Sequence, residues 1–332
     1  MNLPTLSIII PAYNAENTIK KLVDSIYNQK SHNISFEIII VNDGSTDRTK
    51  NIIENLLISR KEIISFDTEN QGVSSSRNTA LDKVQGKFIW MLDSDDIIEN
   101  HAFSTIETYL DDELEVLHFG YKEILPNGEI KEKEVKEFHN YIDGFDFLKN
   151  NDGRLYLWTN IYSKYLLDKN NVRFIDRLLN LEDSLFNIQV LILSKKVKCI
   201  SEYLYVYQYN ENSITNKNNL PQLLKKLDSS FIVHKNLKII RDKQIDKKKY
   251  DILDTKLSHT ELGFFYSLIS ERYPLKSIKE YYDKYLNEKL LPITNYKASI
   301  FLSTFNFVVN NRFLFIFLCK LNLFFRGEVK KA

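Results

Sequence analysis

The sequence has 332 residues, of which 43% are hydrophobic and 27% charged, an ordinary composition for a folded protein with a sizeable core. Its formal net charge is +1, so no overall field favours a nucleic-acid or acidic partner. Two cysteines, Cys199 and Cys319, lie too far apart in sequence for a disulfide framework or a zinc site. The length allows one large domain or a domain with an appendage, and the cysteines suit a reducing compartment.

The first residues, MNLPTLSIIIPAYN, contain a short apolar run that no basic residue precedes. A signal peptide requires a basic start, a longer apolar region and a small-residue cleavage site, so we expect a first β-strand here. The chain also has no run of about eighteen uncharged apolar residues, the length that a membrane-spanning helix requires. These features predict a cytoplasmic protein without a spanning helix.

Strand and helix patterns alternate along the first hundred residues. Continuous apolar runs predict strands, and apolar residues at helical spacing predict helices between them. The expected strands are 6–10, 36–41, 62–66 and 87–92. The expected helices are 15–29, a second helix that Ser45 or Thr46 caps and that continues through residue 57, and 74–84. This order is typical of a Rossmann-like α/β fold, a mostly parallel sheet with helices on both faces.

Polar clusters follow three of these strands, at 11–14, 42–44 and 93–96. The carboxyl ends of parallel strands lie along the same edge of a sheet, and ligands of such sheets bind there. We therefore expect the three clusters to lie close together at one ligand-binding edge.

The pattern changes after residue 100. Two strands, 115–121 and 130–135, flank the turn P-N-G-E and predict a hairpin. Further along we expect two helices, an edge strand rich in tyrosine, and a boundary near residue 220 between an α/β domain and a helical region. The expected helices are 158–168 and 183–193, the edge strand is 203–209, and the helical region is 221–332.

Three acids follow the strand F-I-W-M-L at residues 88–92. In an extended segment Asp93 and Asp95 point to the same side, and Asp96 approaches them from the turn. Hard carboxylate ligands suit Mg²⁺ or Mn²⁺, which leave coordination positions for phosphate oxygens. The alternative is a solvated, turn-forming cluster. An EF-hand is excluded, because position six of such a loop is Ile98 in place of glycine and position twelve is Ser104 in place of glutamate.

A nucleotide would lie beside such a metal at the same edge. Asp43, at the end of the second strand, is placed to accept a hydrogen bond from a base, and the imide N–H of uracil matches it. The loop N-D-G-S-T-D also reads as a helix-capping loop, and the two roles are compatible. Arg77, on the helix after N-Q-G-V-S, is placed to reach the base or the diphosphate. No P-loop or G-x-G-x-x-G motif is present.

The motifs P-A-Y-N-A-E, V-N-D-G-S-T-D, N-Q-G-V-S-S-S-R-N and M-L-D-S-D-D, in this order and spacing, resemble those of glycosyltransferase family 2. The resemblance continues through L-W-T-N-I-Y-S-K-Y-L-L at 157–167 to L-E-D-S-L-F at 181–186 and covers roughly residues 5–215. It implies the GT-A fold, with a catalytic domain at 1–220 whose first part, 1–97, binds the nucleotide-sugar and whose second part, 98–220, binds the acceptor. Within this family, the chain resembles the glycosyltransferases that build bacterial surface polysaccharides such as capsule, O-antigen and exopolysaccharide.

The resemblance implies an inverting transferase that uses a nucleotide-sugar, most often a UDP-sugar, and a divalent metal, Mn²⁺ or Mg²⁺. Pro11, Tyr13 and Glu16 would line the nucleotide pocket, and Asp43 would hold the base.

The resemblance also distributes roles among the acids of the D-S-D-D turn. Asp95 corresponds to the acid next to the metal, with Asp93 or Asp96 around the ribose and the metal. We place Asp95 and Asp96 on the metal side, and Asp93 and Ser94 on the side of the nucleotide-sugar.

The resemblance implies that Asp183 is the catalytic base, with its neighbour Glu182 as the other candidate. From the residues alone, Asp183 reads equally as a first-turn helix acid that the helix dipole favours. A departure from the family lies further on, where Gln208 and Asn210 stand in place of common arginines. Contact between that segment and the diphosphate is therefore in doubt.

Residues 299–326 are dense in Phe, Leu and Ile and are interrupted by Arg312, Lys320 and Arg326. This pattern predicts a helix that lies on an anionic membrane surface, or one that packs on the protein or in a homodimer. The membrane position suits a glycan acceptor on a polyprenyl diphosphate, at the inner face of the cell membrane. A sugar nucleotidyltransferase and a non-catalytic glycosyltransferase-like binding protein are the alternative functions.

Overall fold

The computed structural model describes residues 3–29, 33–151, 155–209, 219–294 and 300–326. The chain divides into two compact units, residues 1–213 and 214–332. This division falls within 210–218, which lie outside the described residues and just before the boundary expected near 220.

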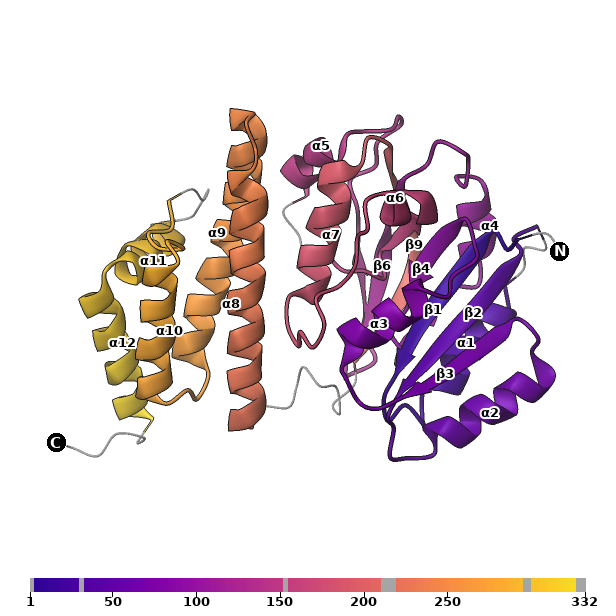
Figure 1. The fold of residues 1–332 in the computed structure, drawn as a ribbon, viewed down its shortest axis with the longest axis horizontal. Helices are drawn as coiled ribbons and strands as arrows, with labels where there is room; N and C mark the ends of the chain where they lie inside the picture. The colour runs from indigo at the N-terminus through magenta and orange to yellow at the C-terminus, as the bar shows by residue number, and fades with distance from the viewer. Residues whose placement is uncertain (1–2, 30–32, 152–154, 210–218, 295–299, 327–332) are drawn as a thin grey trace. The chain divides into compact units, whose positions relative to one another are not determined.

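Four parallel strands form the first half of the sheet in the first unit, in the order β3-β2-β1-β4 (Figure 1). Helices connect them, as the alternating pattern predicts. The elements are β1 (Leu6–Ala12), α1 (Ile19–Tyr27), β2 (Phe36–Asp43), α2 (Thr49–Ser59), β3 (Ile63–Thr68), α3 (Val73–Leu81) and β4 (Phe88–Met91). The central strands β1, β2 and β4 are almost fully buried, which explains their continuous apolar sequences.

The start of α2 differs from the prediction. Arg48 occupies the N-cap position, and the carboxylate of Asp47 accepts from the N–H of Thr49 at 2.9 Å. Ser45 and Thr46 instead bind Asn14 in the loop after β1, with the Asn14 N–H to Ser45 Oγ at 3.0 Å and the Thr46 N–H to Asn14 Oδ1 at 2.8 Å. The predicted capping role of Ser45 or Thr46 is therefore wrong, because a contact between loops uses both side chains.

The sheet continues as β8-β6-β9-β5, with β7 paired to β6. β8 is antiparallel to both β4 and β6, while β6 and β9 are parallel. The elements after β4 are β5 (Ile97–Ile98), α4 (Ala102–Glu107), β6 (Val116–Ile124), β7 (Ile130–Lys133), α5 (Gly144–Asn150), β8 (Asn160–Ser163), α6 (Lys164–Lys169), α7 (Glu182–Leu193) and β9 (Val197–Gln208). The predicted hairpin is confirmed as β6 and β7, and the helix predicted at 183–193 is confirmed as α7.

The helix predicted at 158–168 is wrong over its first half. Residues 160–163 form strand β8, where Ile161 and Tyr162 are fully buried between neighbouring strands, and only α6 is helical. A four-residue segment with two apolar residues fits both the helical and the strand periodicity. It forms a strand here because it pairs with β4 on one side and with β6 on the other. The tyrosine-rich strand begins earlier than predicted and lies between β6 and β5 instead of at the sheet edge.

The described part of the second unit is helical. It contains α8 (Leu220–Asp242), α9 (Lys247–Ser270), α10 (Leu275–Asn287), α11 (Ile300–Asn310) and α12 (Arg312–Phe325). These helices share a core rich in aromatic residues that includes Phe265, Tyr282, Tyr285 and Phe315.

The single helix predicted at 299–326 is wrong, because α11 and α12 meet at a bend of 109°. Asn311 caps α12 by accepting from the N–H of Leu314 at 3.1 Å, and this cap starts a new helix at the bend. No single helix within the described ranges is both long and apolar enough to cross a membrane.

Candidate active site

The loops after β1, β2 and β3 contact one another at the carboxyl end of the parallel strands. Glu16 accepts from the backbone N–H and the side-chain Nε of Arg48, at 3.1 and 3.0 Å, so it ties the first loop to the second. At Gly44, whose φ is +67°, a Cβ would lie 2.7 Å from the backbone nitrogen of Asn70 in the third loop. Glycine is therefore required where the second and third loops meet.

Asp43 is buried, and the backbone holds both of its carboxylate oxygens. Oδ1 accepts from the N–H of Gln71 at 2.8 Å and Oδ2 from the N–H of Gly72 at 2.9 Å. These bonds fix the loop that leads into α3. A carboxylate oxygen has two lone pairs, so Asp43 retains capacity to accept from a base. Its role in holding the loop had no signal in the sequence.

The other residues predicted for the nucleotide pocket lie along the same edge. Pro11 is buried in β1 opposite Val41 of β2, and Tyr13, just beyond β1, is 39% exposed. Glu16 is half-buried in its contact with Arg48.

Arg77 on α3 is buried between two acids from distant parts of the chain. Its Nη2 donates to Asp93 at 2.8 Å and its Nη1 donates to Glu182 at 3.2 Å. Its guanidinium also lies 5.5 Å from the centre of the Phe174 ring, and its Nε is buried without a hydrogen-bond partner. Arg77 therefore joins the strand that carries the D-S-D-D turn to the start of α7, a connection that the sequence did not predict.

The acids of the D-S-D-D turn differ in their surroundings. Asp93 is about one-third exposed, and Ser94 and Asp95 are half-buried. Asp96 is buried and bound to β9, with Tyr205 Oη donating to Oδ2 at 2.5 Å and the N–H of Gln208 donating to Oδ1 at 2.7 Å. Burial, together with the charges of Asp95 and Asp93, raises the pKa of Asp96 well above its usual range.

The first turn of α7 presents Glu182 and Asp183 beside Arg77. Leu181, the N-cap residue, has a left-handed backbone with φ of +61°, a strained conformation for leucine. Asp183 Oδ1 accepts from the N–H of Ser184 at 2.7 Å. Burial raises the pKa of Asp183 to about 7, and the neighbouring charge of Glu182 acts in the same direction. Asp183 is therefore a carboxylate that accepts a proton near neutral pH.

The buried side chain of Asn187 supports this turn. Its Nδ2 donates to the carbonyl of Asp183 at 3.0 Å and to that of Leu155 at 2.9 Å, while its Oδ1 accepts from Tyr162 Oη at 2.8 Å. The sequence motifs did not predict a role for Asn187. The available signal was a lone asparagine within L-F-N-I, an otherwise apolar stretch of helix.

The donor set fits a divalent cation that relies mainly on its substrate for ligands. Within the described residues, no group of three or more His, Cys, Asp and Glu side chains is arranged to hold a metal ion. Mg²⁺ and Mn²⁺ sites in nucleotide enzymes need only one or two carboxylates in addition to phosphate oxygens. Asp96, predicted as a ligand, directs both oxygens to β9, which leaves Asp95 and Asp93 as the carboxylates for such a site.

Residues 7–169 match the family described as Glycosyl transferase family 2. These residues therefore form a domain of this family. The family 2 domain contains Asp43, Arg77 and the D-S-D-D turn, and the pair Glu182 and Asp183 lies just beyond the matched residues. The match favours a glycosyltransferase over the sugar nucleotidyltransferase considered above.

Two curated relatives are bacterial glycosyltransferases. The chain is 29% identical to EpsJ of Bacillus subtilis over 226 residues, which cover 64% of this chain and 63% of EpsJ, less than two thirds of that relative. It is 28% identical to the GalNAc(5)-diNAcBac-PP-undecaprenol β-1,3-glucosyltransferase of Campylobacter jejuni, across 82% of this chain and 85% of the relative.

The fold of this family 2 member is also that of a solved structure. Residues 1–349 of TarS from Staphylococcus aureus, in complex with UDP-GlcNAc, superpose with a TM-score of 0.74 at 20% identity. The similarity covers 98% of this chain and 93% of that chain. The predicted GT-A fold with a helical C-terminal region is confirmed.

Proposed function

We propose that this family 2 member is an inverting, metal-dependent glycosyltransferase that adds a sugar from a UDP-sugar to a glycan of a bacterial surface polysaccharide. The observation that carries the proposal is the ion-pair bridge from Asp93 through Arg77 to Glu182. This bridge holds Asp183, whose pKa is raised to about 7, next to the D-S-D-D turn.

Asp183 is the catalytic base in this proposal. It takes the proton of the acceptor hydroxyl while the acceptor oxygen bonds to the anomeric carbon and the bond from that carbon to the diphosphate breaks. A single displacement of this kind inverts the anomeric carbon. Glu182 is engaged in an ion pair with Arg77, which favours Asp183 between the two candidates.

The edge formed by Tyr13, Asp43 and Asp93 binds the nucleotide-sugar. Asp43 and Tyr13 lie at the ends of the adjacent strands β2 and β1, where a base and a ribose fit beside the D-S-D-D turn. The TarS complex with UDP-GlcNAc supports a UDP-sugar as the donor. Mn²⁺ or Mg²⁺ held by Asp95 and Asp93 would stabilise the charge of the departing diphosphate.

The acceptor is a glycan on a polyprenyl diphosphate, and the protein lies on the inner face of the cell membrane. The Campylobacter relative, named for an undecaprenyl-linked substrate, supports this acceptor class. The outer face of α12 supports the membrane position, because Phe313, Phe317 and Phe325 are 78%, 56% and 76% exposed there. From residue 297 onward the chain has six Lys or Arg and one acid, so this region is attracted to an anionic surface.

A donor screen tests the proposal. The protein is incubated with a panel of UDP-, GDP- and dTDP-sugars, with Mn²⁺, with Mg²⁺ or with a chelator, and melting temperature and nucleotide release are measured. We expect a UDP-sugar to raise the melting temperature only when a metal is present. If no nucleotide-sugar changes melting or releases nucleotide in the presence of metal, the donor assignment is wrong.

A further inference from the structure

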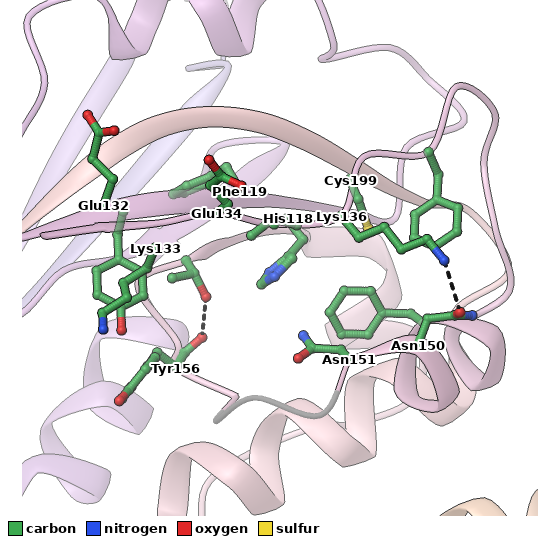
Figure 2. A pocket seen from close by; sticks show the side chains of 15 residues that line it. His118, Phe119, Glu132, Lys133, Glu134, Lys136, Asn150, Asn151, Tyr156 and Cys199 are labelled. Carbon is green, nitrogen blue, oxygen red and sulfur yellow. Dashed lines mark hydrogen bonds between the residues drawn. The ribbon is translucent and has the colours of Figure 1, made fainter.

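A cavity of about 520 Å³ lies between β6, the segment that follows β7, and the end of α5. Figure 2 shows its lining, with His118 and Asn151 directed into the space and Glu132 directed away from them. None of the acids of the candidate active site lines this cavity.

The lining combines aromatic rings with uncharged polar groups. Tyr121, Phe138 and Phe147 contribute rings, and His118, Asn151 and Thr159 contribute an imidazole, an amide and a hydroxyl. His118 is buried and uncharged at neutral pH, because burial lowers its pKa to about 4. Small-molecule pockets typically measure about 300–1,000 Å³ and have apolar walls with a few fixed polar groups.

The charged side chains that line the cavity, among the described residues, are two of each sign: Glu132, Lys133, Glu134 and Lys136. Lys133 Nζ lies 3.6 Å from a carboxylate oxygen of Glu123, and Lys136 Nζ donates to Asn150 Oδ1 at 3.4 Å. Among the residues that the structure describes, no arginine lines the cavity. Because two acids lie among the two lysines, this lining carries no net positive charge for a phosphate, whereas the apolar face and the hydroxyls of a neutral sugar ring match its aromatic and uncharged polar groups.

Stacked aromatic rings connect the cavity to the D-S-D-D turn. Tyr156, which lines the cavity, stacks on Trp158 with ring centres 4.5 Å apart, and Trp158 stacks on Tyr205 at 4.4 Å. The hydroxyl group of Tyr205 in turn donates a hydrogen bond to the carboxylate of Asp96. The cavity is therefore two ring contacts away from an acid of the turn.

A buried polar chain connects the cavity to the proposed base. His118 Nδ1 lies 2.8 Å from Asn160 Oδ1, and Asn160 Nδ2 donates to Asn187 Oδ1 at 3.3 Å. Asn187 donates to the carbonyl of Asp183, so side chains of β6, β8 and α7 lead from the cavity to the turn that carries the base.

We propose that this cavity is a subsite for a neutral sugar unit of the acceptor glycan, next to the unit that receives the transferred sugar. This subsite rests on the proposed glycosyltransferase function, and it specifies the place at which a longer acceptor glycan binds. Contacts to a remote sugar unit orient the terminal hydroxyl at Asp183, so a glycan with this unit is a better acceptor than a single sugar.

Two substitutions of lining residues, Val135→Trp and Asn151→Ala, test the subsite. Val135→Trp places an indole in the cavity, since Val135 is a half-buried lining residue. Ile130→Trp is the matched control, because Ile130 is 58% exposed and does not line this cavity. Asn151→Ala removes a polar partner without adding volume.

Binding is measured first, on an array of bacterial surface oligosaccharides and without donor. We expect the wild type and Ile130→Trp to bind a common set of oligosaccharides that Val135→Trp binds at least about tenfold more weakly, equivalent to ~1.4 kcal/mol. The subsite is refuted if the wild type binds no oligosaccharide, or if Val135→Trp binds the same set equally well. This readout does not depend on transfer, so it stands even if the donor screen fails.

Transfer is measured next, with acceptors of one sugar and of several sugars. For Val135→Trp and Asn151→Ala we expect a higher KM for the longer acceptors, and an unchanged KM for the donor and for the single sugar. Equal losses with short and long acceptors would show a general effect on the fold and contradict the subsite.

Discussion

Arg77 is the residue that organises the candidate site. Its guanidinium pairs with Asp93 from the end of β4 and with Glu182 from the start of α7, residues 89 positions apart in sequence. The ion pair with Arg77 holds Glu182 next to Asp183. Burial of Asp183, together with the adjacent charge of Glu182, raises the pKa of the Asp183 carboxyl. The arrangement gives two adjacent acids different tasks.

The raised pKa of Asp183 predicts a pH dependence. A base acts as the carboxylate, which predominates above its pKa, so kcat/KM for the acceptor should rise with pH and level off above about 7. Asp183→Asn should retain donor binding and reduce transfer by roughly 10²–10⁴-fold, the usual contribution of a general base.

Steady-state kinetics from pH 5 to 9, with donor binding measured by calorimetry, checks this prediction. Asp112→Asn is the control, because the side chain of Asp112 is 97% exposed. Full transfer by Asp183→Asn would place the base elsewhere.

At the scale of elements, the contact between α5 and α7 stabilises the second half of the first unit. The N–H of Gly144, the first residue of α5, donates to the carbonyl of Ser194 at 3.0 Å. A Cβ at Gly144 would lie 1.8 Å from the carbonyl oxygen of Leu191, so the two helices meet only because this residue lacks a side chain. The helix that begins with Glu182 is thereby anchored at its other end.

Two glycine substitutions should therefore change stability in opposite directions. Gly144→Ala should lower the free energy of unfolding by ~1–3 kcal/mol or more, because the added methyl group forces α5 away from α7. Gly263→Ala, inside α9, should raise it by ~0.5–1 kcal/mol, because a Cβ there meets open space and alanine favours the helix.

Urea unfolding checks both variants. Both tryptophans, Trp90 and Trp158, lie in the first unit, so their fluorescence follows Gly144→Ala, and far-ultraviolet circular dichroism follows Gly263→Ala. An unchanged fluorescence midpoint for Gly144→Ala would contradict the close approach of the two helices.

At the scale of the whole molecule, the chain combines a family 2 catalytic unit with a helical unit that has an unusual surface. One face of α12, with Phe315, Cys319 and Leu323, packs in the core of the helical unit. The opposite face exposes Phe313 and Phe317 as well as Lys320. A helix that is apolar on both faces and basic at its exposed side matches a membrane interface.

The full chain should therefore bind vesicles that contain phosphatidylglycerol more strongly than vesicles of phosphatidylcholine alone. Phe313→Ser combined with Phe317→Ser should weaken this binding by about thirtyfold or more, since each substitution removes an exposed apolar side chain worth ~1 kcal/mol or more. Ile245→Ser, at a fully exposed position of the same unit, should leave binding unchanged.

Co-sedimentation with vesicles and sedimentation velocity without them check this prediction. Equal vesicle binding by the double variant and the wild type would contradict the membrane role of α12. A wild-type dimer that the double variant loses would assign the face to a second copy of the chain.

The sequence by itself determined the parallel half of the fold and the edge at which the candidate site forms. Continuous apolar strands can only be buried on both faces, so β1, β2 and β4 and the polar residues after them followed from local pattern. The order of the motifs was also sufficient for the family. These features depend on residues that are neighbours in the chain.

Only the tertiary structure decided which side chains meet. It paired Arg77 with Asp93 and Glu182, bound Asp96 to β9, formed strand β8 where a helix was expected, and broke the C-terminal helix at Asn311. The break at Asn311 comes from a local cap onto Leu314, whereas the other three outcomes depend on partners more distant in sequence, because a short segment carries no record of the strand, helix or charge that will lie against it.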